Sequence, residues 1–283
     1  MADETLRTSP ETPVLRIRPP RRWRLPDLAG IWRYRELLWV FGVRDVTLRF
    51  RQTIAGSVWI VAGPLLSAGV FSFVFGRVAK LDSEGIPYLV FSYAGLVAWT
   101  AFSTTITKAS GSLLANANVI TKVYFPRLVL PFATVFGTLT NLLVTFAMLV
   151  VLMVAYGLPL TWHLVLLPLT ILLVLMLGLG VAAVLAAGSV FFRDVAILTP
   201  TVVSLLLYVS PVAYGTSSVP ADVRTLYLLN PLASLVELWR WSIFGTGTFY
   251  AWSVAFSVVA TLAVFTVGLV LFTRMEPRFT DVI

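Results

Sequence analysis

The sequence predicts an all-α membrane protein with six transmembrane helices, and three observations support this fold class. Residues 128–192 form a run of 65 residues without Asp, Glu, Lys or Arg. Four further charge-free stretches of 23 to 33 residues flank this run. Hydrophobic residues make up 58% of the chain and charged residues only 12%, whereas about 25% is usual in a soluble domain. A bilayer core is about 30 Å thick and needs roughly 20 apolar residues per helix, so each stretch is long enough to span it.

The part of the chain before the first span divides into two segments by composition. Residues 1–26 contain five Pro and six Arg but no apolar run, which is typical of a disordered cytoplasmic tail and not of a cleaved signal peptide. Residues 27–53 mix large apolar and basic residues. This composition predicts an amphipathic interface helix that lies at the membrane surface.

Within residues 27–53 the apolar side chains follow helical spacing. Arg33 and Glu36 lie opposite the apolar stripe, and we expect Gly42 to interrupt the helix. The stripe consists of four residues: Ile31, Tyr34, Leu38 and Phe41. The helix is either a simple basic anchor that orients the first span or a surface that also holds a partner.

The transmembrane domain, residues 54–273, is divided wherever charge or a helix breaker interrupts the apolar sequence. The long charge-free run breaks at Gly157-Leu158-Pro159, because Gly favours turn conformations and Pro lacks an amide donor. The six predicted spans cover about 54–76, 88–107, 128–156, 163–191, 196–214 and 250–273.

Positive charge predicts the orientation of these spans. With six spans and an inside N-terminus, 17 Lys and Arg residues fall inside and four outside. Short loops that are rich in Lys and Arg stay on the cytoplasmic side, so the N-terminus and the tail at 274–283 are expected to be cytoplasmic in a plasma (cell inner) membrane protein. The net charge of +8 reflects this topology, and we expect no nucleic acid as a partner.

Two segments outside the spans stand out. Residues 108–127 form an inside loop with three positive and no negative charges, longer than the roughly 2–8 residues of an ordinary helix connection. We expect a short coupling helix there that docks on a cytoplasmic partner. Residues 215–249 are too apolar for a plain outside loop and too few for two spans. An extracytoplasmic re-entrant helical hairpin fits, because such backbone is tolerated where protein covers it or it lines a cavity.

The residues that catalysis or cofactor binding would require are missing from the sequence. No G-x-x-x-x-G-K-[ST] motif is present to cradle nucleotide phosphates. The chain has one His, His163, and no Cys, which excludes the usual His and Cys metal sites. None of the predicted spans contains an ionisable Asp, Glu, Lys or Arg, which argues against a proton or ion pathway. We therefore expect no catalytic residue, cofactor or metal in this chain.

Five segments of the sequence resemble, in order, the motifs of permease subunits of ABC-type polysaccharide exporters, the family that moves lipid-linked O-antigen, capsule, teichoic acid or related glycans. They are RDVTLRFRQTIAGSVWIVAGPLL at 44–66, NVITKVYFPRLVLP at 118–131, FRDVAILTP at 192–200, SPVAY at 210–214 and LNPLASLVELWRWSIFG at 229–245. The resemblance implies a homodimer in the lipid membrane that works with two copies of a cytoplasmic ATPase. ATP and Mg would bind to that partner, and the substrate would be a polyprenyl-linked polysaccharide.

The resemblance also implies roles for particular residues. Seven residues are assigned to coupling with the ATPase: Arg44, Asp45, Lys108, Asn118, Lys122, Tyr124 and Arg127. Five are assigned to an extracytoplasmic gate: Leu229, Asn230, Pro231, Glu237 and Arg240. Arg44, Arg49 and Arg51 are placed to attract the anionic diphosphate of a lipid carrier, although they could equally be positive-inside anchors.

Aromatic residues supply candidates for the substrate path, because their faces can stack on sugar rings. These candidates are Trp59, Phe71, Tyr93, Trp99, Phe102, Tyr208 and Tyr214. Interfacial belts of Trp and Tyr on many membrane proteins offer a simpler explanation.

Three other functions are weighed against the exporter. The first is an ABC permease for a small hydrophobic molecule or drug, which has the same span count. An integral-membrane enzyme acting on lipid-linked sugar would need clustered acids or His at one membrane face, and the nearest candidates, Asp222 and Glu237, are 15 residues apart. A structural scaffold would leave the five ordered motifs unexplained.

Overall fold

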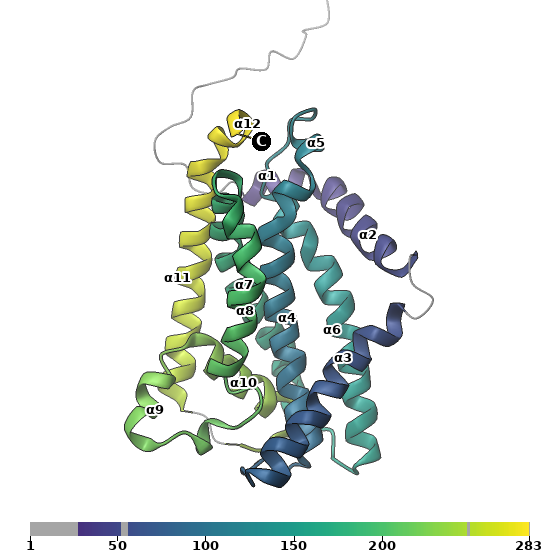
Figure 1. Ribbon diagram of the computed structural model, residues 1–283, viewed down its shortest axis with the longest axis vertical. Helices are drawn as coiled ribbons and strands as arrows, with labels where there is room; N and C mark the ends of the chain where they lie inside the picture. The colour runs from purple at the N-terminus through teal and green to yellow at the C-terminus, as the bar shows by residue number, and fades with distance from the viewer. Residues whose placement is uncertain (1–27, 52–55, 248–249, 283) are drawn as a thin grey trace, which may run out of the picture.

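The computed structural model describes residues 28–51, 56–247 and 250–282 (Figure 1). All of the regular secondary structure in these ranges is helical. The first and last described helices, α1 (Leu28–Arg33) and α12 (Phe279–Val282), lie at the same end of the bundle (Figure 1). That end is called the α12 end here. The predicted tail at 1–26 lies outside the described residues.

Five helical segments in the described ranges are long and apolar enough to cross a membrane. They are Val58–Val78, Tyr88–Ala115, Val129–Ala155, Trp162–Phe191 and Ala251–Arg278. The fifth predicted span, 196–214, corresponds to α8 (Arg193–Val209), which has only 17 residues. It ends where Ser210 adopts an extended conformation, because a residue before proline, here Pro211, is disfavoured in the α region. The count of six spans therefore remains a prediction.

The first of these segments changes its helical type along its length. Helix α3 (Gly56–Phe71) continues directly into the π-helix η1 (Ser72–Val78). The amide of Ala79 donates to the carbonyl oxygen of Val74, five residues earlier, at 2.9 Å. In this segment Gly76 faces Tyr88, and a Cβ atom at Gly76 would lie 2.8 Å from the ring.

Helix α4 (Tyr88–Ala115) is the central element of the bundle and packs against α3, α6, α7, α8 and α10. It extends beyond the predicted end at residue 107, because the polar sequence from Lys108 to Ala115 contains no proline and continues the helix. The predicted coupling segment therefore begins as the last part of α4. It continues as the one-turn helix α5 (Ala117–Ile120) and then turns into α6 (Val129–Ala155).

The remaining long helices pack closely around α4. Helix α6 ends before Gly157, which has a φ of 68°, so the predicted break does occur there. The 3-10 turn η2 (Trp162–Leu166) leads into α7 (Leu167–Phe191). Helix α11 (Ala251–Met275) and the short turn η4 (Glu276–Arg278) complete the bundle. Backbone atoms of Gly180 on α7 and Gly268 on α11 are in direct contact, which brings these two helices very close together.

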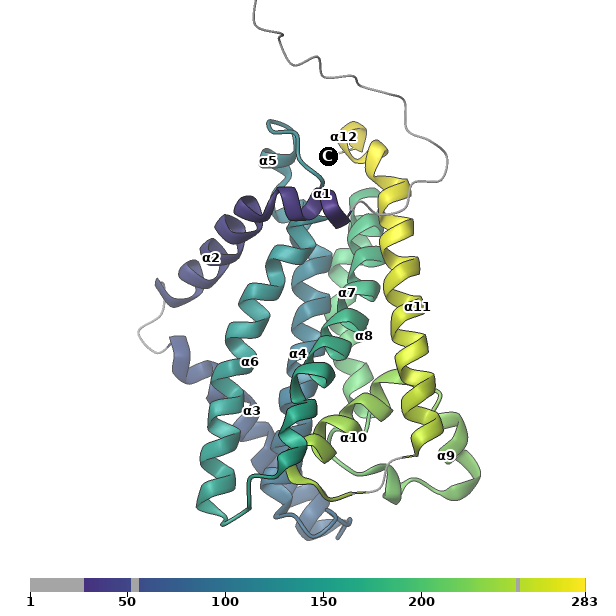
Figure 2. The same ribbon diagram turned by 180° about the vertical axis from the view of Figure 1, so that it is seen from behind.

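Helices α1 and α2 (Arg35–Arg51) lie across the α12 end beside α6 (Figure 2). Ile31 and Phe41 are buried, and the exposed Arg33 and Glu36 face away. The predicted stripe is therefore buried against the protein. Gly42 does not interrupt α2. It packs against the side chain of Phe136, which would lie 2.7 Å from a Cβ atom at this position, so a glycine fits here where a larger residue would not.

At the opposite end the chain forms a compact hairpin (Figures 1 and 2). It contains η3 (Thr216–Ser218), α9 (Ala221–Tyr227) and α10 (Pro231–Phe244). Helix α10 packs against α4, α7, α11 and η2. The side chain of Asn230 caps its first turn, and Gly245, with a φ of 68°, ends it.

Candidate transport path and coupling surface

Arg240 is the centre of a buried polar cluster in the hairpin. Its Nη2 donates to the carbonyl oxygen of Val212 at 2.5 Å, and its Nη1 donates to that of Tyr214 at 3.3 Å. Nη1 also lies 3.5 Å from a carboxylate oxygen of Glu237. The guanidinium covers the ring of Phe91 on α4. These five residues are called the Arg240 cluster below.

The Arg240 cluster joins three segments that are distant in the sequence. Glu237 accepts a 2.8 Å hydrogen bond from the amide of Thr216, while both Glu237 and Arg240 are almost completely buried. A buried charge is very costly unless it is paired and hydrogen-bonded, and here both conditions are met. Arg240 therefore fixes α10 to α4 and to the segment that follows α8.

Two further contacts strengthen the attachment of α10 to α4. The indole nitrogen of Trp239 donates to the carbonyl oxygen of Ala94 at 2.9 Å. Gly95 leaves the space that Arg240 occupies, because a Cβ atom there would lie 2.5 Å from both Nη2 of Arg240 and the oxygen of Val212.

Glu84 lies beside this cluster, in the loop between η1 and α4. It has a φ of 57°, and its carboxylate lies close to Gly215 and Gly247. Ser217 Oγ is 3.5 Å from Glu84 Oε1. Burial raises the pKa of Glu84, and the positive charge of Arg240 opposes this shift only in part.

The five predicted gate residues fall into two groups. Glu237 and Arg240 meet in the buried cluster. The other three lie at the start of α10, where Leu229 is exposed, Asn230 caps the helix and Pro231 occupies its first turn. The structure thus gives Asn230 and Pro231 a local role in starting α10.

The seven predicted path aromatics do not line one common surface. Three are enclosed by the helices of this chain: Tyr93, Trp99 and Phe102. Tyr93 donates a 3.2 Å hydrogen bond to the carbonyl oxygen of Thr145 on α6. Phe71 packs partly against the main core, and Tyr214 Oη lies 3.1 Å from Tyr227 Oη.

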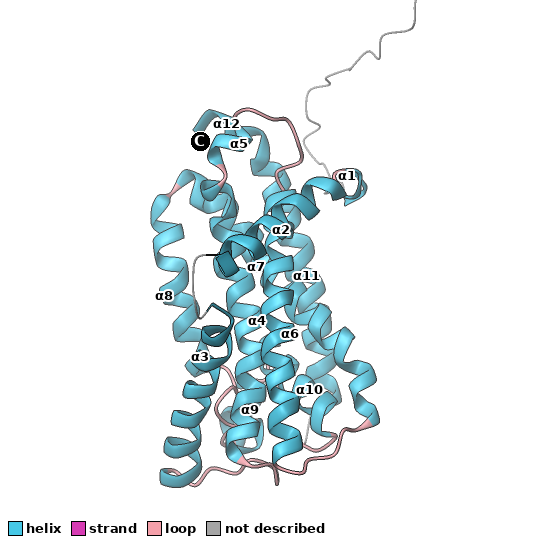
Figure 3. Cartoon of the chain, turned by 90° about the vertical axis from the view of Figure 1, so that its right-hand side faces the viewer, coloured by secondary structure: helices cyan, strands magenta, loops and turns pink. Residues whose placement is uncertain are grey.

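Trp59 and Tyr208, in contrast, are 64% and 67% exposed. They belong to α3 and α8, which lie on the same face of the bundle and form its left edge in Figure 3. In α8 only Thr199 and Val203 are buried. The exposed apolar side chains of this face include Val58, Leu66, Val70, Phe73, Ile197, Leu198, Val202, Leu205 and Val209. We call this surface the α3/α8 face.

At the α12 end, the turn after α5 is the most exposed part of the predicted coupling segment. Residues 121–124, called the coupling turn below, are all exposed, and Tyr124 is 82% exposed. Asn118 and Lys122 also face outward. Arg127 instead turns back, because its amide donates at 2.8 Å to Glu276, whose carboxylate also lies 3.8 Å from the guanidinium.

Of the other three predicted coupling residues, Asp45 and Lys108 form an ion pair with each other, while Arg44 contacts Asn116, which was not predicted. Lys108 Nζ lies 2.6 Å from Asp45 Oδ2, and Arg44 Nη2 donates to Asn116 Oδ1 at 2.6 Å. Arg49 and Arg51 lie in the last turns of α2, and their side chains are outside the part of the chain that the structure describes.

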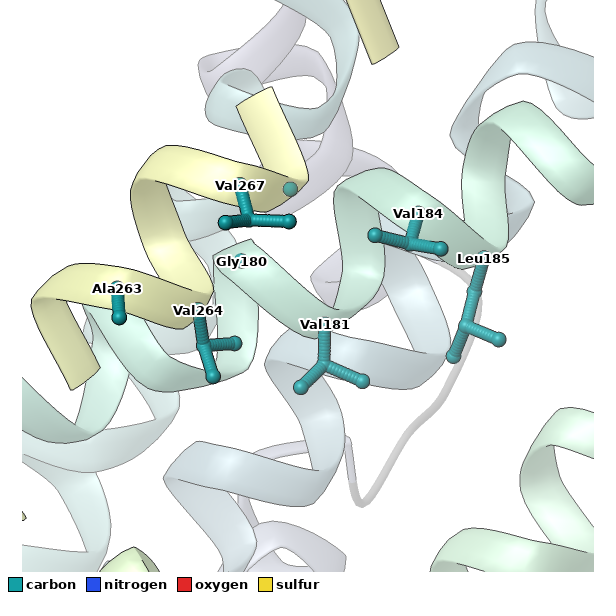
Figure 4. Close-up of a pocket in the computed structure, with 8 residues that line it drawn as sticks. Gly180, Val181, Val184, Leu185, Ala263, Val264 and Val267 are labelled. Atoms are coloured by element: carbon teal, nitrogen blue, oxygen red, sulfur yellow. The ribbon is translucent and has the colours of Figure 1, made fainter. Parts of the chain in front are cut away.

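A groove of about 410 Å³ opens between α7 and α11 (Figure 4). All of its lining residues are apolar: Gly180, Val181, Val184, Leu185, Ala263, Val264, Val267 and Gly268. It can therefore hold only hydrocarbon, and it offers no polar group to a sugar. Among the described residues no group of three or more His, Cys, Asp or Glu could hold a metal ion.

Comparison with known proteins places the chain in a family. The family described as ABC-2 type transporter matches residues 36–244, which include all of α2 except its first residue, the coupling segment and the whole Arg240 cluster. The chain belongs to the ABC-2 type transporter family.

Similar curated proteins cover most of this ABC-2 transporter chain. The O-antigen export system permease protein RfbA of Klebsiella pneumoniae is 30% identical over 250 residues, or 88% of this chain and 95% of the relative. The protein of the same name from Myxococcus xanthus is 32% identical and covers 74% of this chain and 81% of the relative. The polysialic acid transport protein KpsM of Escherichia coli is 24% identical, with 84% and 93% covered.

Sequence reasoning missed several residues that form these sites in the ABC-2 chain. Phe91, Gly95 and Trp239 hold α10 in place, and Gly137 lies beside the pair of Asp45 and Lys108. Three of them, Phe91, Gly95 and Gly137, lie within charge-free stretches, whereas Trp239 lies between Glu237 and Arg240. Their local sequence gives no signal, because each role depends on a helix that is distant in the chain.

Proposed function

We propose that this chain is the membrane-spanning subunit of an ATP-driven exporter of a lipid-linked polysaccharide. The observation that carries the proposal is the match to O-antigen export permeases over 88% of the chain. The polysialic acid transport protein, matched over 84% of the chain, supports the same class of substrate. Because the chain has no phosphate-binding loop, ATP and Mg would bind to a separate ATPase and not to this subunit.

The proposed topology has six spans, with α8 as the fifth in chain order. The α12 end faces the cytoplasm, which is supported by the division of basic residues in the predicted topology, 17 inside against four outside. The hairpin with α10 is then extracytoplasmic and re-entrant. The charges of Glu237 and Arg240 are paired with each other in the Arg240 cluster, as charge at membrane depth must be.

The ATPase would bind at the coupling turn. Asn118, Lys122 and Tyr124 are exposed at the α12 end, and a protruding aromatic side chain next to a positive charge suits a protein partner, since aromatic anchors dominate many interfaces. A dimer of permease chains would present two such turns, which supports two copies of the ATPase.

The second permease copy would pack against the α3/α8 face. An apolar surface of this extent is unusual unless lipid or protein covers it, and α3 and α8 contribute little to the core of this chain. The polysaccharide would pass between the two copies, with Trp59 and Tyr208 as its stacking surfaces. Tyr93, Trp99 and Phe102 would support this wall from within.

The carrier would reach the path from the inner leaflet. Arg44, Arg49 and Arg51 lie on α2 beside the start of α3, where cations would attract an anionic diphosphate. The long charge-free helices offer the lipid part of the carrier a hydrocarbon environment.

The test is deletion of this gene in its native cell, combined with purification of the tagged protein. We expect loss of a surface glycan, accumulation of the same glycan on its lipid inside the cell, and a stoichiometric ATPase in the purified complex. Unchanged surface glycan, together with increased sensitivity to small hydrophobic drugs, would contradict the proposal. That result would favour a drug permease, whereas a purified lone chain that hydrolyses lipid-linked sugar would favour an enzyme.

A further inference from the structure

The ion pair between Asp45 and Lys108 connects α2 to the part of α4 that precedes the coupling turn. Lys108 Nζ lies 2.6 Å from Asp45 Oδ2. The Asp45 side chain is 40% exposed and that of Lys108 is 27% exposed, so the pair lies at the edge of the protein and not in its core. It brings together residues that are 63 positions apart in the sequence.

A glycine on a third helix makes room for this pair. Gly137 on α6 is buried. A Cβ atom at this position would overlap Asp45 Oδ2 and lie 3.2 Å from Lys108 Nζ. The pair therefore packs against the backbone of α6 at Gly137. The two charged groups face each other there and do not extend toward a partner protein.

Two further contacts join the same segments. Arg44 Nη2 donates to Asn116 Oδ1 at 2.6 Å, and Asn116 in turn donates to the carbonyl oxygen of Ser112 at 2.8 Å. The rings of Phe41 on α2 and Phe125 in the coupling segment also pack together, with their centroids 6.1 Å apart. Helix α2 thus contacts the coupling segment both before and after α5.

We propose that Arg44, Asp45 and Lys108 are positioning residues, which hold α2 and the coupling segment together as one unit during transport instead of contacting the ATPase. This inference rests on the proposed function. Only the outward-facing coupling turn then meets the ATPase, and its displacement carries α2 and α4 with it. Because α4 also bears Phe91 and Gly95, one helix connects this unit to the Arg240 cluster at the other end (Figure 1).

The decisive variant is Gly137→Ala. Residue 137 is buried and cannot touch an ATPase, whereas the methyl group that the substitution adds would displace the carboxylate of Asp45. It is compared with Asp45→Asn and with the exchange Asp45→Lys/Lys108→Glu. Glu36→Gln removes a charge from the exposed side of the same helix and is the matched control. Exposed ion pairs add little to folding stability, so all of these variants are expected to fold.

Each variant is expressed in the deletion strain, and its complex with the ATPase is purified. Surface glycan and ATP hydrolysis are then measured. We expect Gly137→Ala and Asp45→Asn to reduce the glycan exported per ATP hydrolysed by about fivefold or more, the lower range of typical coupling effects. The amount of bound ATPase stays normal, the exchanged pair recovers export, and Glu36→Gln behaves as the native chain does.

Two results would overturn the inference. One is full export by both Gly137→Ala and Asp45→Asn. The other is loss of bound ATPase in Asp45→Asn without recovery in the exchanged pair, since that pattern would make Asp45 a contact with the ATPase. If the native chain itself fails to restore surface glycan in the deletion strain, the proposed function is wrong. That outcome is separate from either result for the variants.

Discussion

The guanidinium carbon of Arg240 lies 4.0 Å from the centre of the Phe91 ring. Because Arg240 belongs to α10 and Phe91 to α4, this cation–π contact holds the hairpin against the central helix of the bundle. The same guanidinium is bound by two carbonyl oxygens and a carboxylate. One side chain thus determines where the end of α8, α10 and α4 meet, and its removal has effects on all three.

Replacement of Arg240 by Met is expected to destabilise the protein strongly. It leaves the buried carboxylate of Glu237 without its partner, and breaking a buried pair in this way costs about 3–5 kcal/mol. Thermal unfolding of the purified chain in detergent measures the change. The double variant Glu237→Gln/Arg240→Met should recover part of the loss, and a double variant no more stable than Arg240→Met would contradict this account.

Replacement of Gly95 by Ala tests the space that Arg240 needs. The added methyl would lie 2.5 Å from both Arg240 Nη2 and the oxygen of Val212, and such overpacking costs about 1–3 kcal/mol. Gly111→Ala on the same helix is the control, because nothing lies within 4 Å of its Cβ position. That control should keep or raise the unfolding temperature, since Ala favours a helix more than Gly does. Equal effects of the two substitutions would argue against a specific role for Gly95.

Replacement of Gly180 by Ala is expected to force α7 and α11 apart. Its Cβ would lie 2.7 Å from backbone atoms of Phe265, which cannot rotate away, so we expect a loss of about 1–3 kcal/mol. Gly188→Ala, also on α7, meets only Val195 at 3.7 Å or more and should be close to neutral. The unfolding temperatures of the two variants check this, and a neutral Gly180→Ala would show that the helices can separate without cost.

Stability is expected to depend on pH through Glu84. Burial raises its pKa above the ordinary value of 4.5, so the folded chain binds a proton more tightly than the unfolded chain does. This contribution to stability is therefore complete below about pH 4.5 and is lost as the pH rises through the raised pKa. Glu84→Gln should flatten this part of the curve of unfolding temperature against pH, while Asp222→Asn, an exposed carboxylate on α9, should leave it unchanged. A curve of native shape for Glu84→Gln would contradict the assignment.

Replacement of Tyr124 by Ala should weaken the complex with the ATPase and leave the permease itself intact. The ring is 82% exposed, so its loss removes little packing within the chain, whereas an aromatic anchor at an interface is commonly worth about 2 kcal/mol or more. The amount of ATPase that co-purifies measures binding, and the unfolding temperature is the control. Normal co-purification and normal export together would show that Tyr124 makes no important contact.

The helices of this fold follow largely from the sequence, because absence of charge over about 20 residues is a local property. Five of the predicted spans correspond to long apolar helices, and the hairpin helix α10 lies within the predicted segment 215–249. The lengths of α4 and α8 could not be predicted as well. Polar residues continued α4 as far as Ala115, and Pro211 ended α8 sooner than its hydropathy suggested.

The sites were less predictable, because they depend on contacts between distant segments. Gly42 has the local character of a helix breaker, yet α2 continues through it beside Phe136. Similarly, nothing in the local sequence of Lys108 indicates Asp45 as its partner, and nothing near Tyr93 shows that its ring is enclosed. The charge and exposure of the coupling turn, by contrast, could be anticipated from its polar sequence.

The π-helix η1 has a consequence for insertions and deletions in this chain. A turn closed by bonds from residue i to i+5 holds one residue more than an α-helical turn, so Ser72–Val78 behaves as an α-helix that has accepted an extra residue. Deleting one residue within it should restore an ordinary α-helix. Gly76 should stay against Tyr88 if the deleted residue follows Gly76 in the sequence. A deletion before Gly76 would turn that glycine by about 100° around the helix axis and bring a bulkier neighbour against α4.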